Sequence, residues 1–158
     1  MSKRNSGFTL IELLVVIGIL GILLAIVLIA INPARQFAQA NNTARRSDVT
    51  TLLNAIHQYS ADNKGKLPTG IPVEDPSTPA SEAKEISKAG ADICALISPT
   101  YVASLPTDPK LNTAAVTDCT SSYVTGYAVV QDAAGRVTVA APDAEAIGGA
   151  SVTIAVTR

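Results

Sequence analysis

The sequence has few of the residues that usually build catalytic, metal-binding and base-stacking sites. It contains no tryptophan, four tyrosines, two phenylalanines and one histidine among 158 residues. So few aromatic rings argue against a surface on which nucleic-acid bases stack. His57 is the single histidine. Because no second ligand or catalytic partner accompanies it in the sequence, we expect an ordinary surface histidine.

Charge of either sign is also scarce. Charged residues make up 16% of the chain, and the formal net charge is −1. A nucleic-acid-binding domain is expected to be basic, so this balance gives no sign of a nucleic-acid site. The sequence also lacks a Ser/His/Asp arrangement, a Cys/His cluster with metal-ligand spacing and a phosphate-binding loop. It therefore predicts neither an enzyme nor a bound cofactor.

The apolar residues that are present are concentrated in one run. Residues 13–31 carry no charge, and these 19 residues match the roughly 20 that a helix needs to cross a bilayer core. Lys3 and Arg4 precede the run, and basic flanks tend to stay in the cytoplasm. We therefore predict a single pass through the inner membrane, with the N-terminus cytoplasmic and everything after residue 31 outside.

Two simpler explanations compete for this run. A secretory signal peptide has an apolar region of about 7–15 residues, which is shorter than this run, although residues 37–40 could serve as a weak cleavage site. A plain anchor explains the length, and the alternative function is thus a single-pass, membrane-anchored extracytoplasmic binding module. Neither explanation accounts for Glu12, which lies directly against the run.

The cost of Glu12 in a membrane can be estimated. The run holds 15 Leu, Ile or Val residues, which together favour insertion by roughly 4 to 9 kcal/mol, whereas one carboxylate costs at most about 3 kcal/mol. Insertion therefore tolerates Glu12 without explaining it. An ionisable group at the edge of a span indicates a function and a partner of opposite charge.

Residues 7–12, GFTLIE, resemble the processing motif of type IV pilins and of the pseudopilins of type II secretion. The short leader before them, with Lys3 and Arg4, is similar to the leaders of that family. The resemblance implies a prepilin that a prepilin peptidase cleaves after Gly7, usually with methylation of the new N-terminus on Phe8. It also implies that Glu12 pairs with that new α-amino group in a filament.

Physical chemistry supports such a pair. Helices packed in a filament core exclude water, so a carboxylate there needs a counter-ion, and an α-ammonium on Phe8 of a neighbouring subunit supplies one. Two unit charges about 4 Å apart attract by roughly 4 kcal/mol at an effective dielectric constant of 20. Because one axial offset between subunits satisfies the pair, Glu12 and Phe8 would also set the register of assembly.

The apolar helix also departs from the family pattern. Gly18 and Gly21 each cost about 1 kcal/mol relative to alanine and indicate local weakness or close helix contact. Gly21 lies where family members commonly carry a glycine. Many of them have a proline at the position of Ile29, whereas this chain has Pro33, which is expected to disturb the helix.

Residues 34–62 predict a continuation of the helix with one apolar stripe, formed by Val49, Leu52, Leu53, Ile56 and Tyr59. Gly65 is the expected stop. We therefore divide the chain into a leader (1–7), a transmembrane and assembly helix (8–31), an amphipathic continuation (32–65) and a globular head (66–158).

The head is expected to be α+β. Residues 80–97, with Thr78 as N-cap, predict a second short helix that buries Ile86, Ile93 and Ile97. Residues 105–109, LPTDP, resemble a stretch that leads into the sheet of pseudopilin-like heads. Residues 123–131, 136–141 and 151–157 alternate with period two and predict a three-stranded antiparallel sheet, which the helix stripe would cover.

The head also contains two cysteines and two aspartates that bear on its chemistry. Cys94 and Cys119 both follow the span and so lie outside, where a disulfide can persist, and we therefore predict a Cys94–Cys119 bridge, with two buried thiols as the alternative. Asp118 and Asp132 could contribute to a Ca²⁺ site of the kind found in some pseudopilin heads. Two scattered carboxylates are a poor match to the six to eight oxygens that Ca²⁺ takes.

The sequence thus predicts a structural subunit of a type IV pilus or pseudopilus. Its partners would be other copies of the chain or pilin co-subunits, the prepilin peptidase, and the inner membrane before assembly. After assembly the filament would lie at the cell surface as a pilus or in the periplasm as a pseudopilus. Adhesion, motility, DNA uptake and secretion all remain open as its use.

Overall fold

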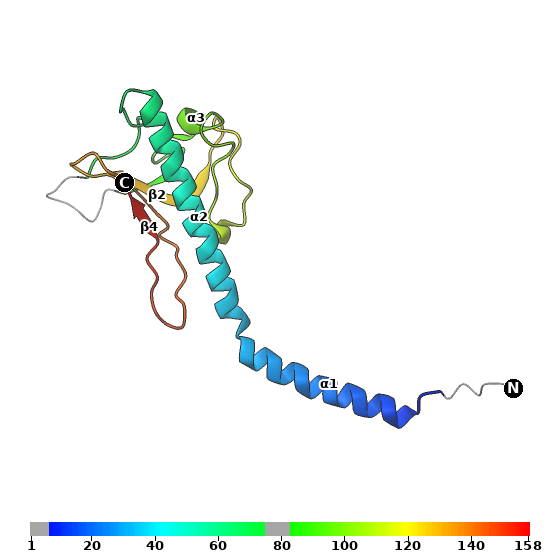
Figure 1. Ribbon diagram of the computed structural model, residues 1–158. Coiled ribbons are helices and arrows are strands. Elements are labelled where there is room, and N and C mark those ends of the chain that lie inside the picture. Colours follow the sequence, from blue (N-terminus) through cyan, green and yellow to red (C-terminus); the bar gives the residue numbers. More distant parts are fainter. Residues whose placement is uncertain (1–6, 75–82) are drawn as a thin grey trace. The chain divides into compact units, whose positions relative to one another are not determined.

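The first helix, α1 (Leu10–Ile31), begins just after Thr9 in the computed structural model, which describes residues 7–74 and 83–158 (Figure 1). Thr9 has extended backbone angles and caps the helix, and 22 residues without a proline follow it. The chain forms two compact units, Met1–Phe37 and Ala38–Arg158.

The helical region continues after a single interruption at Asn32. α2 (Pro33–Asp62) starts at the next residue, and Asn32 has a left-handed backbone with φ of 45°. Proline lacks an N–H group and disfavours the helical conformation of the residue before it, yet it suits the first position of a new helix. The N–H groups of Arg35 and Gln36 donate to the Asn32 carbonyl. The predicted long N-terminal helix is therefore confirmed, with the break at the Asn32–Pro33 step.

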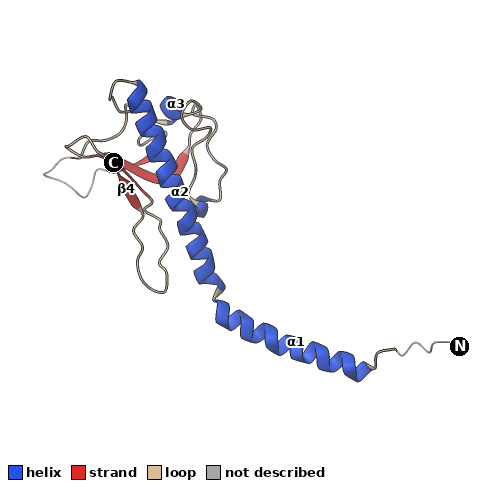
Figure 2. Ribbon diagram, viewed as in Figure 1, coloured by secondary structure: helices blue, strands red, loops and turns tan. Residues whose placement is uncertain are grey.

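The Ala38–Arg158 unit contains a small antiparallel sheet, as predicted, but with four strands instead of three (Figure 2). The strands are β1 (Lys84–Ser87), β2 (Val124–Gln131), β3 (Val137–Ala140) and β4 (Ala155–Thr157), hydrogen-bonded in that order. The last three match the strands predicted from the period-two pattern. The structure thus confirms the α+β, pilin-like fold class.

The helix predicted over residues 80–97 is wrong for most of its length. Residues 84–87 form β1, and only one helical turn, α3 (Cys94–Ile97), is present. β1 pairs antiparallel with β2, which supplies hydrogen bonds that a helix would have supplied internally and turns Ile86 into the core. Tertiary pairing thus overrides local helix propensity here. Thr78, the predicted N-cap, lies outside the described residues.

The core lies between α2 and the sheet. The predicted stripe supplies Val49, Leu52, Leu53 and Ile56, all fully buried, and Tyr59 packs against them half-buried. The sheet and the segments beside it contribute further fully buried side chains: Ile86, Ile93, Ile97, Leu105, Tyr127, Val129, Val137 and Val139. Ile86, Ile93 and Ile97 are thus buried as expected, although they come from a strand, a loop and a helical turn.

His57 is half-buried instead of lying free at the surface. Its Nε2 atom is buried and has no hydrogen-bond partner. The ring lines a hollow together with Leu67, Ile71 and Gln131, because the segment after α2 folds back beside the helix. The expectation of an ordinary surface histidine therefore underestimated the burial of this ring.

The disulfide expected from the sequence is present. Cys94 and Cys119 are bonded, with Cα atoms 5.4 Å apart and a sequence separation of 25 residues. Cys94 is fully buried at the start of α3, and Cys119 is half-buried in the loop before β2. The bond therefore ties an otherwise long loop to the core.

Removing this bond should destabilise the head. We expect Cys94→Ser with Cys119→Ser to lower the free energy of unfolding by about 3 kcal/mol, since the open loop regains its entropy in the unfolded chain. Non-reducing peptide mapping of protein from the cell envelope should show the two cysteine peptides joined. Freely alkylated thiols in that material would contradict the assignment.

Candidate functional site

The N-terminal site is built around a capping box at the start of α1. The Thr9 hydroxyl oxygen accepts from the Glu12 N–H at 3.3 Å, and the Thr9 N–H donates to Glu12 Oε2 at 2.8 Å. The Thr9 hydroxyl also donates to Oε2 at 2.7 Å. These reciprocal bonds satisfy helix-end donors and fix the first turn. Glu12 is thereby held with its carboxylate toward the N-terminal end of the helix.

The same cap leaves the predicted cleavage bond outside the helix. Gly7 to Thr9 have no regular secondary structure, and the Phe8 side chain is 89% exposed. A side chain added at Gly7 would meet no atom within 4 Å. The bond between Gly7 and Phe8 therefore lies in an exposed, non-helical segment, which is a conformation that a peptidase can bind.

Glu12 is surrounded by apolar side chains. It lines a shallow hollow on α1 with Phe8, Ile11, Val15 and Val16. None of the ion pairs found among the described residues includes Glu12. The arrangement is thus a fixed carboxylate in an apolar surface, with no counter-ion among the described residues.

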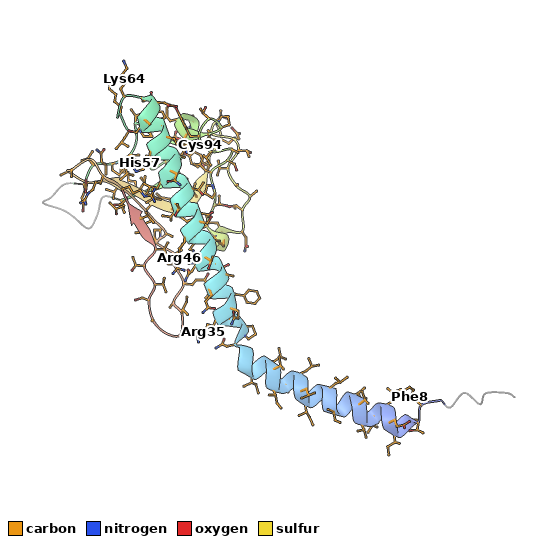
Figure 3. All side chains as sticks on the ribbon, viewed as in Figure 1. Phe8, Arg35, Arg46, His57, Lys64 and Cys94 are labelled. Carbon is orange, nitrogen blue, oxygen red and sulfur yellow. A yellow bond between two sulfur atoms is a disulfide. The ribbon has the colours of Figure 1, made fainter. Side chains whose placement is uncertain are left out.

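The rest of α1 offers a continuous apolar surface. Every large apolar side chain from Leu10 to Ile29 is between 48% and 84% exposed, and side chains project on all sides of the helix (Figure 3). Residues Leu10–Ile29 are long and apolar enough to cross a membrane. At Gly18 and Gly21 an added Cβ would meet nothing within 4 Å. Among the described residues nothing packs against these two glycines, and their small size lets a neighbouring helix approach closely.

A second polar site, buried in the head, was missed by the sequence analysis. Arg45 on α2 donates from Nε to Asp108 Oδ2 at 2.7 Å and from an Nη atom to Oδ1 at 2.8 Å. Both side chains are fully buried. Burial alone raises the pKa of Asp108, but hydrogen bonds from Arg45 and from the Lys110 N–H outweigh it, so its pKa lies below the usual value. Asp108 is therefore a buried anion paired with a buried cation.

This pair attaches the LPTDP segment to both α2 and the sheet. The Asp108 N–H donates to the Thr125 carbonyl in β2, and its carboxylate caps a short 3₁₀ helix, η1 (Pro109–Leu111). Gly126 has a φ of +78°, and a Cβ there would lie 2.7 Å from the Asp108 Cβ. The LPTDP segment thus places the Asp108 carboxylate against Arg45 on α2. Gly126 leaves space for the Asp108 side chain, because any larger residue there would clash with it.

The loop between β3 and β4 is fastened to the same place. Glu145 accepts from Arg45 at 3.2 Å and from the Asn41 side-chain amide at 2.8 Å. Asn42 is fully buried and exchanges two hydrogen bonds with the Glu145 backbone. One helix face therefore holds two loops that are 63 to 104 residues away in the sequence.

Asp118 and Asp132 lie in separate local turns. Asp118 accepts from the backbone and hydroxyl of Thr120 and from the hydroxyl of Ser121. Asp132 accepts from Ala134 and Arg136 in the turn that joins β2 to β3. Within residues 7–74 and 83–158 no cluster of three or more His, Cys, Asp or Glu side chains could hold a metal ion. The two carboxylates shape turns and are not brought together.

Comparison with known proteins agrees with these features. Residues 2–28 match the family model described as the prokaryotic N-terminal methylation motif. The chain is 32% identical over 114 residues to the type II secretion system core protein G of Dickeya chrysanthemi. These aligned residues make up 69% of this chain and 65% of that protein. It is 33% identical over 111 residues to core protein G of Aeromonas hydrophila, with 68% of each chain covered. The chain thus spans about two thirds of the length of these curated relatives. No solved structure matches it significantly.

The GFTLIE motif, the exposed apolar helix and the antiparallel sheet beneath α2 define a pilin-like protein. The match to core protein G of Aeromonas hydrophila, with 33% identical residues over 68% of each chain, narrows the class of protein. The chain belongs to the type II secretion pseudopilin family.

Proposed function

We propose that this chain is a structural subunit of a pseudopilus, cleaved after Gly7 and polymerised through α1 into a filament. The single observation that carries the proposal is Glu12, a carboxylate fixed one turn into a helix whose surface is otherwise apolar and exposed. A membrane anchor has no use for that carboxylate. In a filament the carboxylate would have a partner, because cleavage creates an α-ammonium on Phe8 of each neighbouring subunit.

The proposed sequence of events follows from the chemistry of α1. Before assembly α1 spans the inner membrane, where lipid covers its apolar surface, and the head lies outside. The prepilin peptidase cleaves between Gly7 and Phe8, and the new N-terminus is methylated. Other copies of the chain then replace lipid around α1, with Glu12 of one subunit paired to Phe8 of the next. The role is structural, and no catalytic step is assigned to the chain.

Processing can be tested directly on the mature protein. We expect mass spectrometry of envelope or filament material to show Phe8 at the N-terminus, with the added mass of a methyl group. Gly7→Leu should keep Met1 and stay unassembled, while its head folds normally, because a Cβ at Gly7 meets no other atom. A wild-type mature chain that still begins at Met1 would refute the proposal.

A further inference from the structure

The head carries an apolar hollow that nothing in the described part of the chain fills. Among the described residues of the Ala38–Arg158 unit, three large apolar side chains remain exposed: Val73, Leu111 and Val124. Leu111, at the end of η1, and Val124, at the start of β2, line the same hollow of about 390 Å³. Val116, which is half-buried, and Tyr123, which is buried, extend its apolar lining. Two of these three exposed apolar side chains therefore lie together at the hollow.

The walls of this hollow are held in position. Leu105 and Val116 exchange two backbone hydrogen bonds, at 3.0 and 2.8 Å. Cys119, in the same loop, is tied to α3 by the disulfide. Asp118, on the rim, is fixed by three hydrogen bonds from Thr120 and Ser121. The hollow is thus preformed, which lowers the entropy cost of binding there.

A group that fits the hollow is exposed elsewhere in the chain. Phe37, on α2, is 70% exposed, and no other aromatic residue lies between residues 9 and 58. A phenyl ring in water loses the stabilisation that burial of its 150–250 Å² would give. Because residues 33–47 are otherwise mostly polar, Phe37 is an isolated apolar group that stays largely exposed among the described residues.

The charges around the two sites are complementary. Residues 33–47 contain no acidic residue, and Arg35 and Arg46 take part in none of the described ion pairs (Figure 3). Asp118 on the rim of the hollow has no cationic partner among the described residues. Hydrogen bonds from Ser121 and Thr120 hold its pKa far below the usual value, so it is an anion at neutral pH. Opposite charges within about 8 Å still attract at physiological ionic strength.

We infer that Phe37 of one copy of the chain docks in the Leu111–Val124 hollow of a neighbouring copy. The inference rests on the proposed function, since it needs copies that lie side by side in a filament. It adds a lateral contact between a helix and a head to the contacts between α1 helices. Arg35 and Arg46 then lie near the acidic rim of the hollow, without entering it.

A photo-crosslinking experiment tests this contact. The full-length chain would carry p-benzoylphenylalanine at position 37 and be irradiated in cells that assemble the filament. We expect covalent dimers in which the label is attached within residues 111–124 of a second copy. Labels attached within the same chain, attached to another region, or absent from a filament that has formed would overturn the inference. The same label at Ala61, which is exposed near the far end of α2, is the control and should give few of these dimers.

Variants separate the lateral contact from the proposed function itself. Phe37→Ser and Leu111→Ser should each weaken subunit association about tenfold or more, because a large apolar group loses its burial. Phe37→Leu should restore much of the filament yield. Val73→Ser removes an exposed apolar group outside the hollow and should change nothing. All four should still be cleaved after Gly7. Normal filament yield from Phe37→Ser would overturn the contact, whereas loss of cleavage in the wild type would overturn the proposed function.

Discussion

Replacing Glu12 with alanine is expected to abolish filament formation while the protein still enters the membrane. Removal of a charge only eases insertion. In the filament, however, the α-ammonium of Phe8 would be buried without a counter-ion, at a cost of several kcal/mol per subunit. A loss of about 4 kcal/mol corresponds to a roughly thousandfold weaker association. The measurement is the amount of the subunit in the membrane and filament fractions of cells in which the variant is the only copy.

Glutamine at the same position separates the charge of Glu12 from its part in the capping box. Glutamine can still complete the capping box with Thr9, because its side-chain oxygen accepts the Thr9 N–H, but it carries no charge. If the charge matters, Glu12→Gln should fail as Glu12→Ala does. The head should keep its disulfide and its protease resistance in both variants. Wild-type filament yield from Glu12→Ala would rule out the counter-ion mechanism.

Replacing Asp108 with alanine should have the largest effect on stability. The change leaves the Arg45 guanidinium buried with only a partly exposed Glu145 nearby. Breaking a buried ion pair in this way costs about 3–5 kcal/mol, which is a large share of the total stability of a small domain. Urea unfolding of the full chain in detergent, followed by circular dichroism, would measure the loss. A fall of less than about 1 kcal/mol would contradict the structural role of the pair.

The neighbouring Lys110 supplies a matched control. Its ammonium pairs with Asp143 at 2.8 Å, but both side chains are largely exposed, at 64% and 46%. Such pairs contribute about 0–1 kcal/mol, so Lys110→Ala should be nearly neutral. It also leaves the backbone N–H that donates to Asp108 in place.

The Asp108 pair also predicts how stability depends on pH. The pKa of Asp108 is lowered in the folded protein, so its contribution is fully present above the unfolded value of about 3.9. It is lost as the pH falls through the lower folded pKa. The difference in stability between the wild type and Asp108→Ala should therefore shrink below about pH 4.

The amino-acid sequence by itself determined the N-terminal half of this protein. The capping residues, the uncharged run and the apolar stripe of α2 act through neighbours at most a few residues away, or through the surrounding solvent. The same local rules located the disturbance at Pro33 and three of the four strands. The role of Glu12 could be proposed from sequence for the same reason, since a carboxylate against an uncharged run conflicts with its own surroundings.

Only the tertiary structure decided what happens in the head. Residues 84–87 became a strand because β2, about 40 residues later, was there to pair with them. In the sequence, Arg45 is one of several polar residues outside the apolar stripe of α2. It is buried because Asp108 reaches it from 63 residues away, and the free energy of that pair exists only once both side chains have left water together. The hollow between Leu111 and Val124 likewise depends on a loop closed by distant contacts at Leu105 and Cys94. Burial and pairing across such separations leave no periodic trace in the sequence.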